Sequence, residues 1–445
     1  MSSITPVPAP TERDRATTVL VLGGDGFIAG YLIAALRRRG WRVLRGVRMH
    51  GARTLRDDER VCDFTTMTAP EHWRDALDGV DAVVNAAGIL RESGRQTFDA
   101  IHVDGPLALA RACVDAGVRR FVQISALGLP ADGAFIASKH RFDETLAALP
   151  LSAVALRPSV VYSATGSYGG TSMLRALAAL PFAHALPGDG RWPIQPIAAE
   201  DLGELVARAV DNDVRGIHEV GGPEVMSLRD YQNAWRAWLR IPGTRAIAVP
   251  EALVGLQVTV GEWLGNGPMG QTMWRMLRRG NVVSDAALPT LRERFDFAPR
   301  PLREALAAHP SQVQDRWQAQ LYFLAPLLKF GVIALWLLSA WAGFATPAAQ
   351  IEALAAGSPL AALAPEALVA LARATAGLDL LLAAWLLIGW RSRACIALML
   401  LSVLAYTLVF GALLPALWLD PLGGLAKNLA LLPALAVLWV LVDRR

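Results

Sequence analysis

A glycine-rich turn near the start of the chain is the first set of residues whose types and spacing could do chemistry. It follows a short apolar, β-branched run, residues 17–22, and precedes a helical pattern of apolar residues. Gly23 allows a tight turn, Gly26 lets the backbone approach a pyrophosphate, and Ala29 permits close packing of helix on strand. Free N–H groups at the helix start favour phosphate. The sequence therefore predicts a dinucleotide site at Gly23, Gly24, Asp25, Gly26, Phe27 and Ile28.

The end of the second expected strand, residues 42–47, bears on which dinucleotide fits. An acidic residue there would hydrogen-bond the ribose 2′-hydroxyl and favour NAD. The strand instead ends in an Arg-Gly-Val-Arg sequence without a carboxylate. Arg48 is placed to meet a 2′-phosphate through its guanidinium fork, which favours NADP(H) over NAD(H). The plainer alternative is that Arg48 is a solvated charge at a strand end.

Strand-like runs and helical segments alternate along the first seven-tenths of the chain. This alternation is typical of an α/β fold, a Rossmann-type doubly wound parallel sheet with helices on both faces. We expect this domain, with a small substrate lobe, over residues 17–312, after a flexible tail at residues 1–16. The expected strands are residues 17–22, 42–47, 80–85, 121–124 and 153–156, and the helices between them include residues 106–116 and 138–149.

The last third of the chain has a different composition. The whole chain is 53% hydrophobic and 18% charged, with a mean hydropathy of +0.35. Four apolar stretches each approach or exceed the roughly 20 residues that cross a bilayer, at residues 321–345, 367–390, 394–419 and 422–442. We therefore expect an all-α four-helix transmembrane bundle at residues 321–445, joined to the first domain by a linker at residues 313–320.

Basic residues predict the orientation of this bundle. Arg391 and Arg393 lie between the second and third stretches, and Arg444 and Arg445 follow the fourth. The loops after the first and third stretches contain no Lys or Arg. The positive-inside rule then places the N-terminal domain and the C-terminus in the cytoplasm, on a multi-pass protein of the inner cell membrane.

Composition also argues against several classes of protein. Three scattered cysteines do not form a disulfide framework or a cysteine-based zinc site, and we expect no metal. A net charge of +4 is too small to indicate nucleic-acid binding.

The ordered set of motifs resembles the short-chain dehydrogenase/reductase superfamily, in its atypical, extended epimerase/dehydratase-like members. It is similar to the group that includes the NADPH-binding accessory subunit of respiratory complex I. The C-terminal part, with Asp420, Pro421 and Leu422 followed by Lys427 and Asn428, resembles the DoxX-like four-helix membrane family. The first resemblance covers residues 17–310 and rests on residues 21–28, 63–64, 84–88, 124–128, 138–139, 156–162, 186–190, 195–197 and 200–202.

The resemblance implies further site residues. In this family a Tyr four residues before a Lys serves as general acid or base, and a Ser polarises the substrate carbonyl. Lys139 and Ser125 match the Lys and the Ser as catalytic residues, but Phe135 stands at the Tyr position and has no proton to exchange. Possible substitute acids are Tyr162, Tyr168 and His140. The implied cofactor contacts beyond the glycine turn are Asp63, Phe64, Ala86, Ala87, Gly88, Ser125, Lys139, Pro158 and Val160.

Three functions remain open at this point. In the first, the chain is a membrane-tethered, NADP(H)-dependent oxidoreductase or epimerase-like enzyme that acts on an apolar or membrane-associated substrate. Alternatively it is a dinucleotide-binding module without turnover, which supports a membrane-protein partner or senses redox state. In the third reading the membrane bundle carries its own activity and the first domain regulates it.

Two other features could bear on the substrate. Asp379 is an ionisable residue inside a membrane stretch, where charge costs about 2.5–3.5 kcal/mol on insertion scales. Lys427 and Asn428 could reach its helix, either as part of a polar site or as plain helix packing. In addition, residues 251–279 combine tryptophan, apolar and basic residues in a manner typical of a membrane-surface helix. Packing of a substrate lobe explains that segment equally well.

Overall fold

The computed structural model describes residues 17–49, 54–263, 265, 270–356, 358–419 and 424–442. The expected N-terminal tail, the motif at residues 420–422 and the two arginines at positions 444 and 445 lie outside the described residues. The chain divides into two compact units, Met1–Ala319 and Gln320–Arg445.

A seven-stranded parallel sheet organises the first unit. Its strands lie in the order β11-β6-β5-β4-β1-β2-β3, and every neighbouring pair is parallel. The central strands are rich in Val, Leu and Ile and fully buried, as strands covered on both faces must be. This confirms the predicted fold class. The strands are β1 (Thr18–Leu22), β2 (Arg42–Val47), β3 (Glu59–Val61), β4 (Ala82–Asn85), β5 (Arg120–Ile124), β6 (Ala153–Pro158) and β11 (Gly216–Val220).

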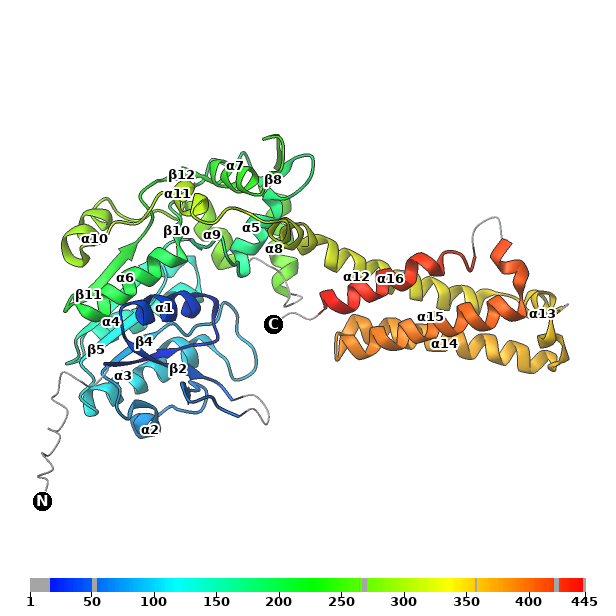
Figure 1. Ribbon diagram of the computed structural model, residues 1–445, viewed down its shortest axis with the longest axis horizontal. Helices are drawn as coiled ribbons and strands as arrows, with labels where there is room; N and C mark the ends of the chain where they lie inside the picture. Colours follow the sequence, from blue (N-terminus) through cyan, green and yellow to red (C-terminus); the bar gives the residue numbers. More distant parts are fainter. Residues whose placement is uncertain are drawn as a thin grey trace, which may run out of the picture. The chain divides into compact units, whose positions relative to one another are not determined.

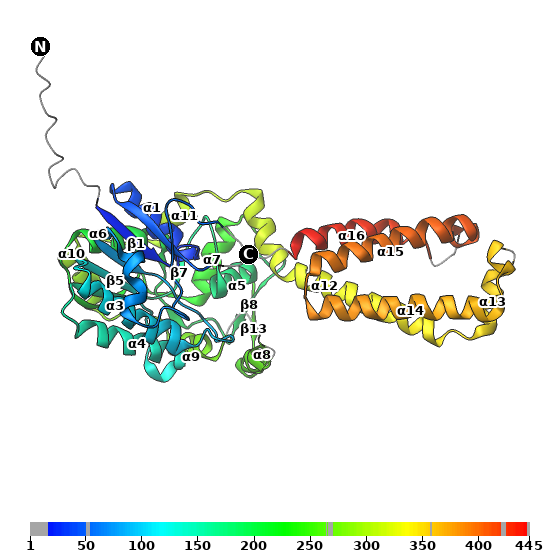
Figure 2. The same ribbon diagram turned by 90° about the horizontal axis from the view of Figure 1, so that it is seen from below.

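Helices cover both faces of the sheet (Figure 1). One face packs against α1 (Phe27–Arg38), α6 (Ala199–Asp211) and α10 (Ala287–Phe295), and the other against α2 (Arg74–Leu77), α3 (Gly105–Asp115) and α4 (Ala134–Ala147). Figure 2 shows α1 and α6 on one side of the strands and α3 and α4 on the other. The alternate residues of β1 divide between the two cores, as a strand period of two requires.

A smaller lobe follows the sixth strand of the sheet. Its core contains Tyr162, Tyr231 and Trp235, which meet edge to face. The lobe's short strands are β7 (Val161–Tyr162), β8 (His184–Pro187), β9 (Pro193–Ile194), β10 (Ile197–Ala198), β12 (Met226–Ser227) and β13 (Ala246–Val249). Its helices are α5 (Gly169–Ala178), α7 (Leu228–Trp238), α8 (Glu251–Trp263), α9 (Gln271–Arg279) and α11 (Leu302–Ala307).

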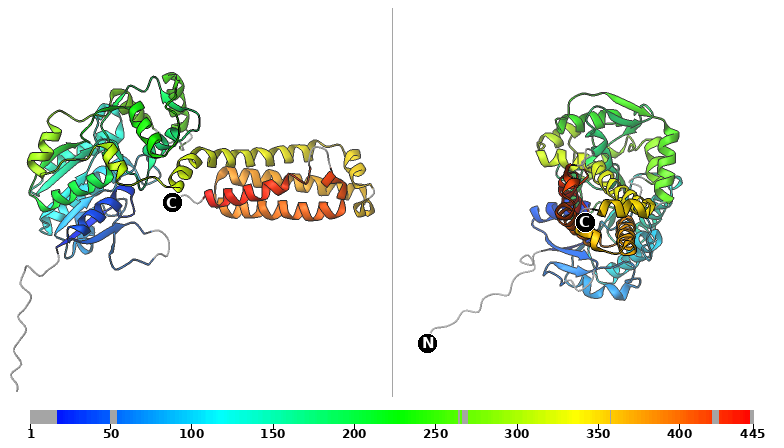
Figure 3. Two further views of the ribbon diagram at one scale, coloured as in Figure 1. Left: turned by 45° about the horizontal axis from the view of Figure 1, so that its top comes forward. Right: turned by 90° about the vertical axis from the view of Figure 1, so that its right-hand side faces the viewer.

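The second unit is a bundle of apolar helices, drawn in yellow to red and lying side by side in Figure 3. Among the described residues, three helices are long and apolar enough to cross a membrane: α12 (Val313–Ala345), α14 (Pro365–Ile388) and α15 (Ser392–Leu413). A short helix, α13 (Ala348–Ala355), connects the first two. Residues 313–320, expected as a linker, instead form the first turns of α12.

The fourth apolar stretch folds differently from the expectation of a full crossing. Its helix, α16 (Asn428–Leu441), has 14 residues, which is about 21 Å of rise. A bilayer core is about 30 Å thick. The third stretch likewise ends as a helix at Leu413, and a 3₁₀ turn at Pro415–Leu419 follows. Pro415 opens that 3₁₀ turn, whereas α16 continues through Pro433 and is preceded by a turn at residues 424–427.

Polar side chains pair with each other inside this bundle. The Ser339 hydroxyl of α12 donates to Asp379 of α14 at 2.7 Å, and Asn428 donates to Thr407 of α15 at 2.9 Å. Arg373 donates to backbone carbonyls of α12 and of the turn after it, not to a carboxylate. Helix packing through paired polar groups accounts for these contacts. Asn428 binds α15 and not the helix of Asp379.

Candidate dinucleotide and catalytic site

The carboxyl ends of the parallel strands bring the predicted site residues to one edge of the sheet. The order β2-β1-β4 means that the chain leaves β1 in one direction and reaches β4 on the other side. Such a reversal of strand order leaves a crevice at the carboxyl edge, where open α/β sheets bind ligands. The glycine turn, residues 86–88, Ser125 and Pro158 all lie at strand ends on this edge.

The glycine turn has the geometry of a phosphate cradle. Gly23 adopts φ +71°, and a Cβ there would lie 3.0 Å from Cα of Ala87. A Cβ on Gly26 would lie 2.9 Å from the carbonyl oxygen of Gly23, so both positions require glycine. Helix α1 begins at Phe27 without a side-chain cap and without an acidic residue in its first turn. Its N-terminal N–H groups therefore suit the phosphates of a dinucleotide.

Arg45, on the neighbouring strand β2, contacts the glycine turn. Its guanidinium group donates to the Gly24 carbonyl oxygen at 3.1 Å and pairs with Asp25 at 2.6 Å and Glu59 at 3.3 Å. Arg45 thereby neutralises Asp25 in the turn, a role that the sequence analysis missed. Arg48 lies just beyond the end of β2, with an exposed side chain.

The other expected cofactor contacts lie at neighbouring strand ends. Asp63 follows β3 and accepts two hydrogen bonds from Thr65, so it caps its own loop. Phe64 is buried beside Trp73 and leaves no room for a side chain at Gly105. Pro158 ends β6, and the carbonyl oxygen of Val160 accepts a hydrogen bond from Ile197. All four residues lie at or just after the carboxyl ends of strands, on the same edge of the sheet as the glycine turn.

Lys139 lies fully inside the site, on α4. A Cβ on Gly88 would lie 3.3 Å from the Lys139 Nζ atom, so the glycine makes room for the ammonium group. The ammonium donates to the Ile124 carbonyl oxygen at 3.1 Å. Burial lowers the pKa of Lys139 to about 8, against the opposing charge of Asp143. A buried amine with a lowered pKa beside the carboxyl end of a strand is a candidate functional group.

Ser125 belongs to a buried network that the sequence analysis did not identify. Its hydroxyl donates to Asp143 at 2.7 Å, and the Arg157 guanidinium donates to the same carboxylate oxygen at 2.8 Å. Burial raises the pKa of Asp143, while Ser125 and Arg157 oppose that shift. Asp143 lies four residues after Lys139 on the same helical face, which was the available signal in the sequence.

Phe135 occupies the position at which the family resemblance implies a tyrosine. Its ring lies 5.9 Å from Lys139 Nζ and meets His102 edge to face at 5.5 Å. The Ile89 N–H group donates to His102 Nε2, which leaves the proton on Nδ1 for Ser138. Burial lowers the pKa of His102 to about 2, so the ring is neutral. Phe135 itself has a hydrocarbon ring and offers no exchangeable proton at this position.

The three possible substitute acids lie in different places. Tyr162 is buried in the small lobe beside Tyr231, and burial raises its pKa. His140 bonds to the Ala126 carbonyl oxygen at 3.0 Å. Tyr168 is 64% exposed and stacks on Phe27, the first residue of α1, at 6.4 Å between ring centroids. Of the three, Tyr168 alone adjoins the glycine turn.

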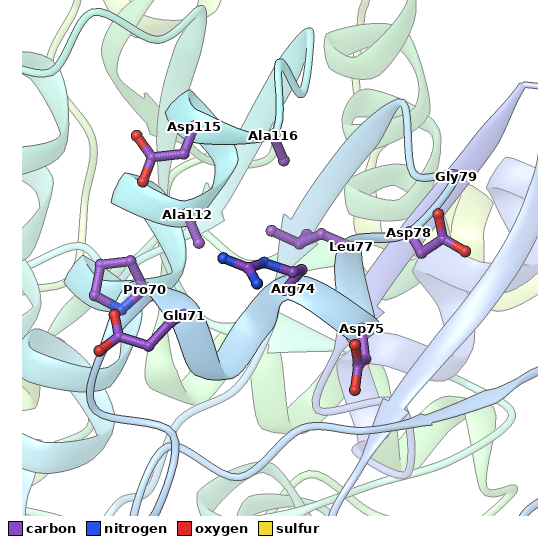
Figure 4. Close-up of a pocket in the computed structure, with 10 residues that line it drawn as sticks. All are labelled: Pro70, Glu71, Arg74, Asp75, Leu77, Asp78, Gly79, Ala112, Asp115 and Ala116. Atoms are coloured by element: carbon purple, nitrogen blue, oxygen red, sulfur yellow. The ribbon is translucent and has the colours of Figure 1, made fainter.

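A hollow of about 850 Å³ lies elsewhere on the first unit (Figure 4). It lies between the segment 70–79 and the end of α3, near the amino ends of β4 and β5 and away from the crevice. Charged surface residues line much of it. The candidate site is therefore not this hollow but the crevice at the carboxyl edge of the sheet, where the glycine turn and Lys139 come together.

We predict that Lys139→Met raises the free energy of unfolding of this domain at pH 7. The ordinary pKa of 10.5 falls to about 8 on folding, which corresponds to a penalty of up to about 3 kcal/mol. Between pH 8 and 10.5 the unfolded chain binds more protons than the folded chain, so the free energy of unfolding of the parent rises with pH. The difference in stability between Lys139→Met and the parent therefore shrinks over this range. Heat unfolding of the full chain in detergent at pH 7 and pH 10 measures this. Arg141→Met, on the exposed side of α4, is the control, and a destabilised Lys139→Met variant at pH 7 contradicts the prediction.

Comparison with known proteins agrees with this geometry. Residues 19–221 match the NAD dependent epimerase/dehydratase family, and residues 333–438 match the DoxX-like family. The chain is 28% identical to ceramide reductase of Caulobacter vibrioides over 152 residues, which cover 34% of this chain and 48% of that protein. It is 30% identical to Protein BRI1-5 ENHANCED 1 of Arabidopsis thaliana over 131 residues, 26% of this chain and 36% of that protein. The chain thus spans about half or less of the curated relatives it matches.

Among solved structures, the chain is similar to UDP-N-acetylglucosamine 4-epimerase from Bacillus cereus, with 15% identity and a TM-score of 0.49. That match covers 66% of this chain and 97% of the epimerase. The family match of the first domain implies a nicotinamide dinucleotide, and the glycine cradle beside Lys139 fits one. Both resemblances predicted from the sequence are confirmed: the chain joins a domain of the NAD dependent epimerase/dehydratase family to a DoxX-like membrane domain.

Proposed function

We propose that the chain is a membrane-anchored, NADP(H)-dependent oxidoreductase or epimerase-like enzyme that acts on an apolar or membrane-associated substrate. The observation that carries the proposal is the convergence of the glycine turn with the buried Lys139 at one edge of the sheet. A structural sheet has no need of a buried ammonium group beside Gly88. Its burial opposes folding, as the lowered pKa shows.

Each site residue has a distinct task in this proposal. A bound nicotinamide supplies or accepts a hydride. The Lys139 ammonium holds the ribose hydroxyls and adds positive charge where negative charge develops. Ser125 lies beside it and keeps lone pairs for a hydrogen bond, although its proton is directed to Asp143. Tyr168 is our candidate for the substitute acid, because its exposed ring adjoins the glycine turn.

The NADP preference rests on the end of β2. Arg48 directly follows β2, and no carboxylate stands at that strand end to bind a ribose 2′-hydroxyl. Arg45 already pairs with Asp25 and Glu59. Asp25 is therefore neutralised, and Arg48 is left to meet a 2′-phosphate.

The substrate class rests on the membrane domain and on one relative. Three helices among the described residues are long and apolar enough to cross a membrane, and they would keep the dinucleotide domain close to lipid. The relative named ceramide reductase adds support for a lipid-like substrate with a carbonyl or hydroxyl group.

A second candidate function is dinucleotide binding without turnover, as a structural or redox-sensing module for a membrane partner. Phe135 favours it, because the ring that faces Lys139 and His102 lacks a hydroxyl. In this alternative the cofactor stabilises the domain and reports the redox state of the cell.

We predict that NADPH binds more tightly than NADH, and that Arg48→Asp removes most of that preference. A lost charge-assisted contact to the 2′-phosphate should cost about 1.5–3 kcal/mol, roughly ten- to a hundredfold in affinity. Calorimetric titration of both nucleotides measures it. Arg38→Asp makes the same charge change on the surface of α1 and should leave the preference intact. Equal affinities in the parent remove the basis for NADP.

Phe135→Tyr should raise NADPH oxidation with hydrophobic ketones or quinones if the site has only lost its acid. A positioned acid is typically worth about 10²–10⁴-fold in rate. Phe98→Tyr, on the ring that packs against Phe135, is the matched control. If the parent already turns over, Phe135→Tyr changes little and Tyr168→Phe abolishes activity. No turnover in any variant, with NADPH still bound, favours the binding module.

We also propose that the protein is multi-pass in the inner membrane with both chain ends cytoplasmic, which requires the 14-residue α16 to complete the fourth crossing. Reporter fusions after positions 393 and 445 should then behave as cytoplasmic, and a fusion near position 357 as external. Complete release of the chain by alkaline carbonate would contradict membrane integration. A short α16 that fails to cross would instead make the fusion after position 445 external.

A further inference from the structure

Helix α8 carries an apolar face that no described residue covers. Leu253, Leu256, Val260 and Trp263 are 56%, 60%, 44% and 85% exposed. Their spacing places them on one side of the helix, and we call them the α8 apolar face. The opposite side is also apolar, since Val254 and Val258 pack against Trp274 of α9. A helix that is apolar on both sides normally needs a second partner.

The helix is held firmly in the small lobe. Gln271 of α9 donates to Glu262 at 3.0 Å and to Thr259 at 2.9 Å, and Arg278 pairs with Glu251 at 3.1 Å. The two helices therefore form one packed pair. The α8 apolar face is a fixed surface of that pair, and its exposure follows from the fold.

This helix pair also adjoins the candidate site. Thr272 of α9 lies against Gly133, two residues before Phe135, and Met273 lies against Gly170, two residues after Tyr168. Arg279 pairs with Asp132 at 3.0 Å. Whatever binds the α8 apolar face is thereby connected, through α9, to the segments that hold Phe135 and Tyr168.

We propose that the α8 apolar face docks into the surface of a lipid bilayer that contains anionic headgroups. Four apolar side chains with a terminal tryptophan suit the boundary between headgroups and acyl chains. Arg275, Arg278 and Arg279 on α9 are exposed. Arg278 and Arg279 pair with Glu251 and Asp132, and Arg275, which has no carboxylate partner among the described residues, is the cation that meets an anionic headgroup. Among the described residues of the same chain, three helices are long and apolar enough to cross a membrane, which favours a bilayer as the surface that this face meets.

Lipid docking would set where the substrate enters. A site flanked by a helix pair that rests in headgroups would receive molecules dissolved in the membrane. This consequence deepens the proposed function, but the docking itself needs neither a cofactor nor turnover. The two proposals can therefore fail separately.

The test uses the full chain in nanodiscs with a fluorophore on a cysteine at position 256. The natural cysteines, Cys62, Cys113 and Cys395, are buried, so labelling is selective. Leu256→Cys should lose fluorescence when nitroxide-bearing lipid is included, and more strongly with phosphatidylglycerol than with phosphatidylcholine alone. Ile217→Cys, an exposed apolar position on the edge strand β11, is the matched control and should keep its fluorescence.

Three results would overturn the proposal. One is unquenched fluorescence at position 256, and another is equal quenching at positions 256 and 217. The third is shielding of position 256 in dilute detergent that grows with protein concentration, since a second copy of the chain would then cover the face. If the face docks as proposed, adding Leu253→Glu and Val260→Glu to the labelled variant should prevent docking and restore the fluorescence at position 256. Turnover of NADPH, measured in the same nanodiscs, reports on the enzyme proposal independently.

Discussion

The close approach of the glycine turn, residues 86–88 and helix α4 at the carboxyl edge of the sheet is the constraint on which the site depends. Gly23, at φ +71°, lies against the backbone of Ala87 and disfavours any larger residue, and Gly88 makes a tight contact with the Lys139 ammonium group. Parallel pairing of β1 with β2 and β4 fixes these loops beside one another. The position of the glycine turn beside residues 86–88 follows from that pairing, and α4 adds the ammonium group of Lys139.

The charge inside the site is arranged at a cost to stability. Lys139, Asp143 and Arg157 are largely removed from water, and one oxygen of Asp143 and one nitrogen of Arg157 have no hydrogen-bond partner among the described residues. Unsatisfied buried polar atoms destabilise a fold. They persist where function requires charge in a fixed place, and Asp143 holds the Ser125 hydroxyl in that arrangement.

Local patterns in the sequence predicted much of this arrangement. The glycine turn and the strand at residues 42–47 follow from glycine spacing and β-branched runs, which act over a few residues. The network around Asp143 of α4 could not be predicted in this way, because its partners lie elsewhere in the sequence: Ser125 follows β5 and Arg157 belongs to β6. The hydrogen bond between His102 and Ser138 likewise arises from tertiary packing. The fourth membrane stretch was expected to be a longer helix because hydropathy does not distinguish the turn at residues 424–427 from helix, and α16 begins only at Asn428.

The central claim is that this edge of the sheet binds a nicotinamide dinucleotide with its reactive ring beside Lys139. A structure of the full chain determined with NADPH tests it most directly. The account predicts a pyrophosphate on the N–H groups at the start of α1, the 2′-phosphate near Arg48 and the nicotinamide between Gly88 and Phe135. A dinucleotide bound elsewhere, or no binding at saturating NADPH or NADH, would contradict it.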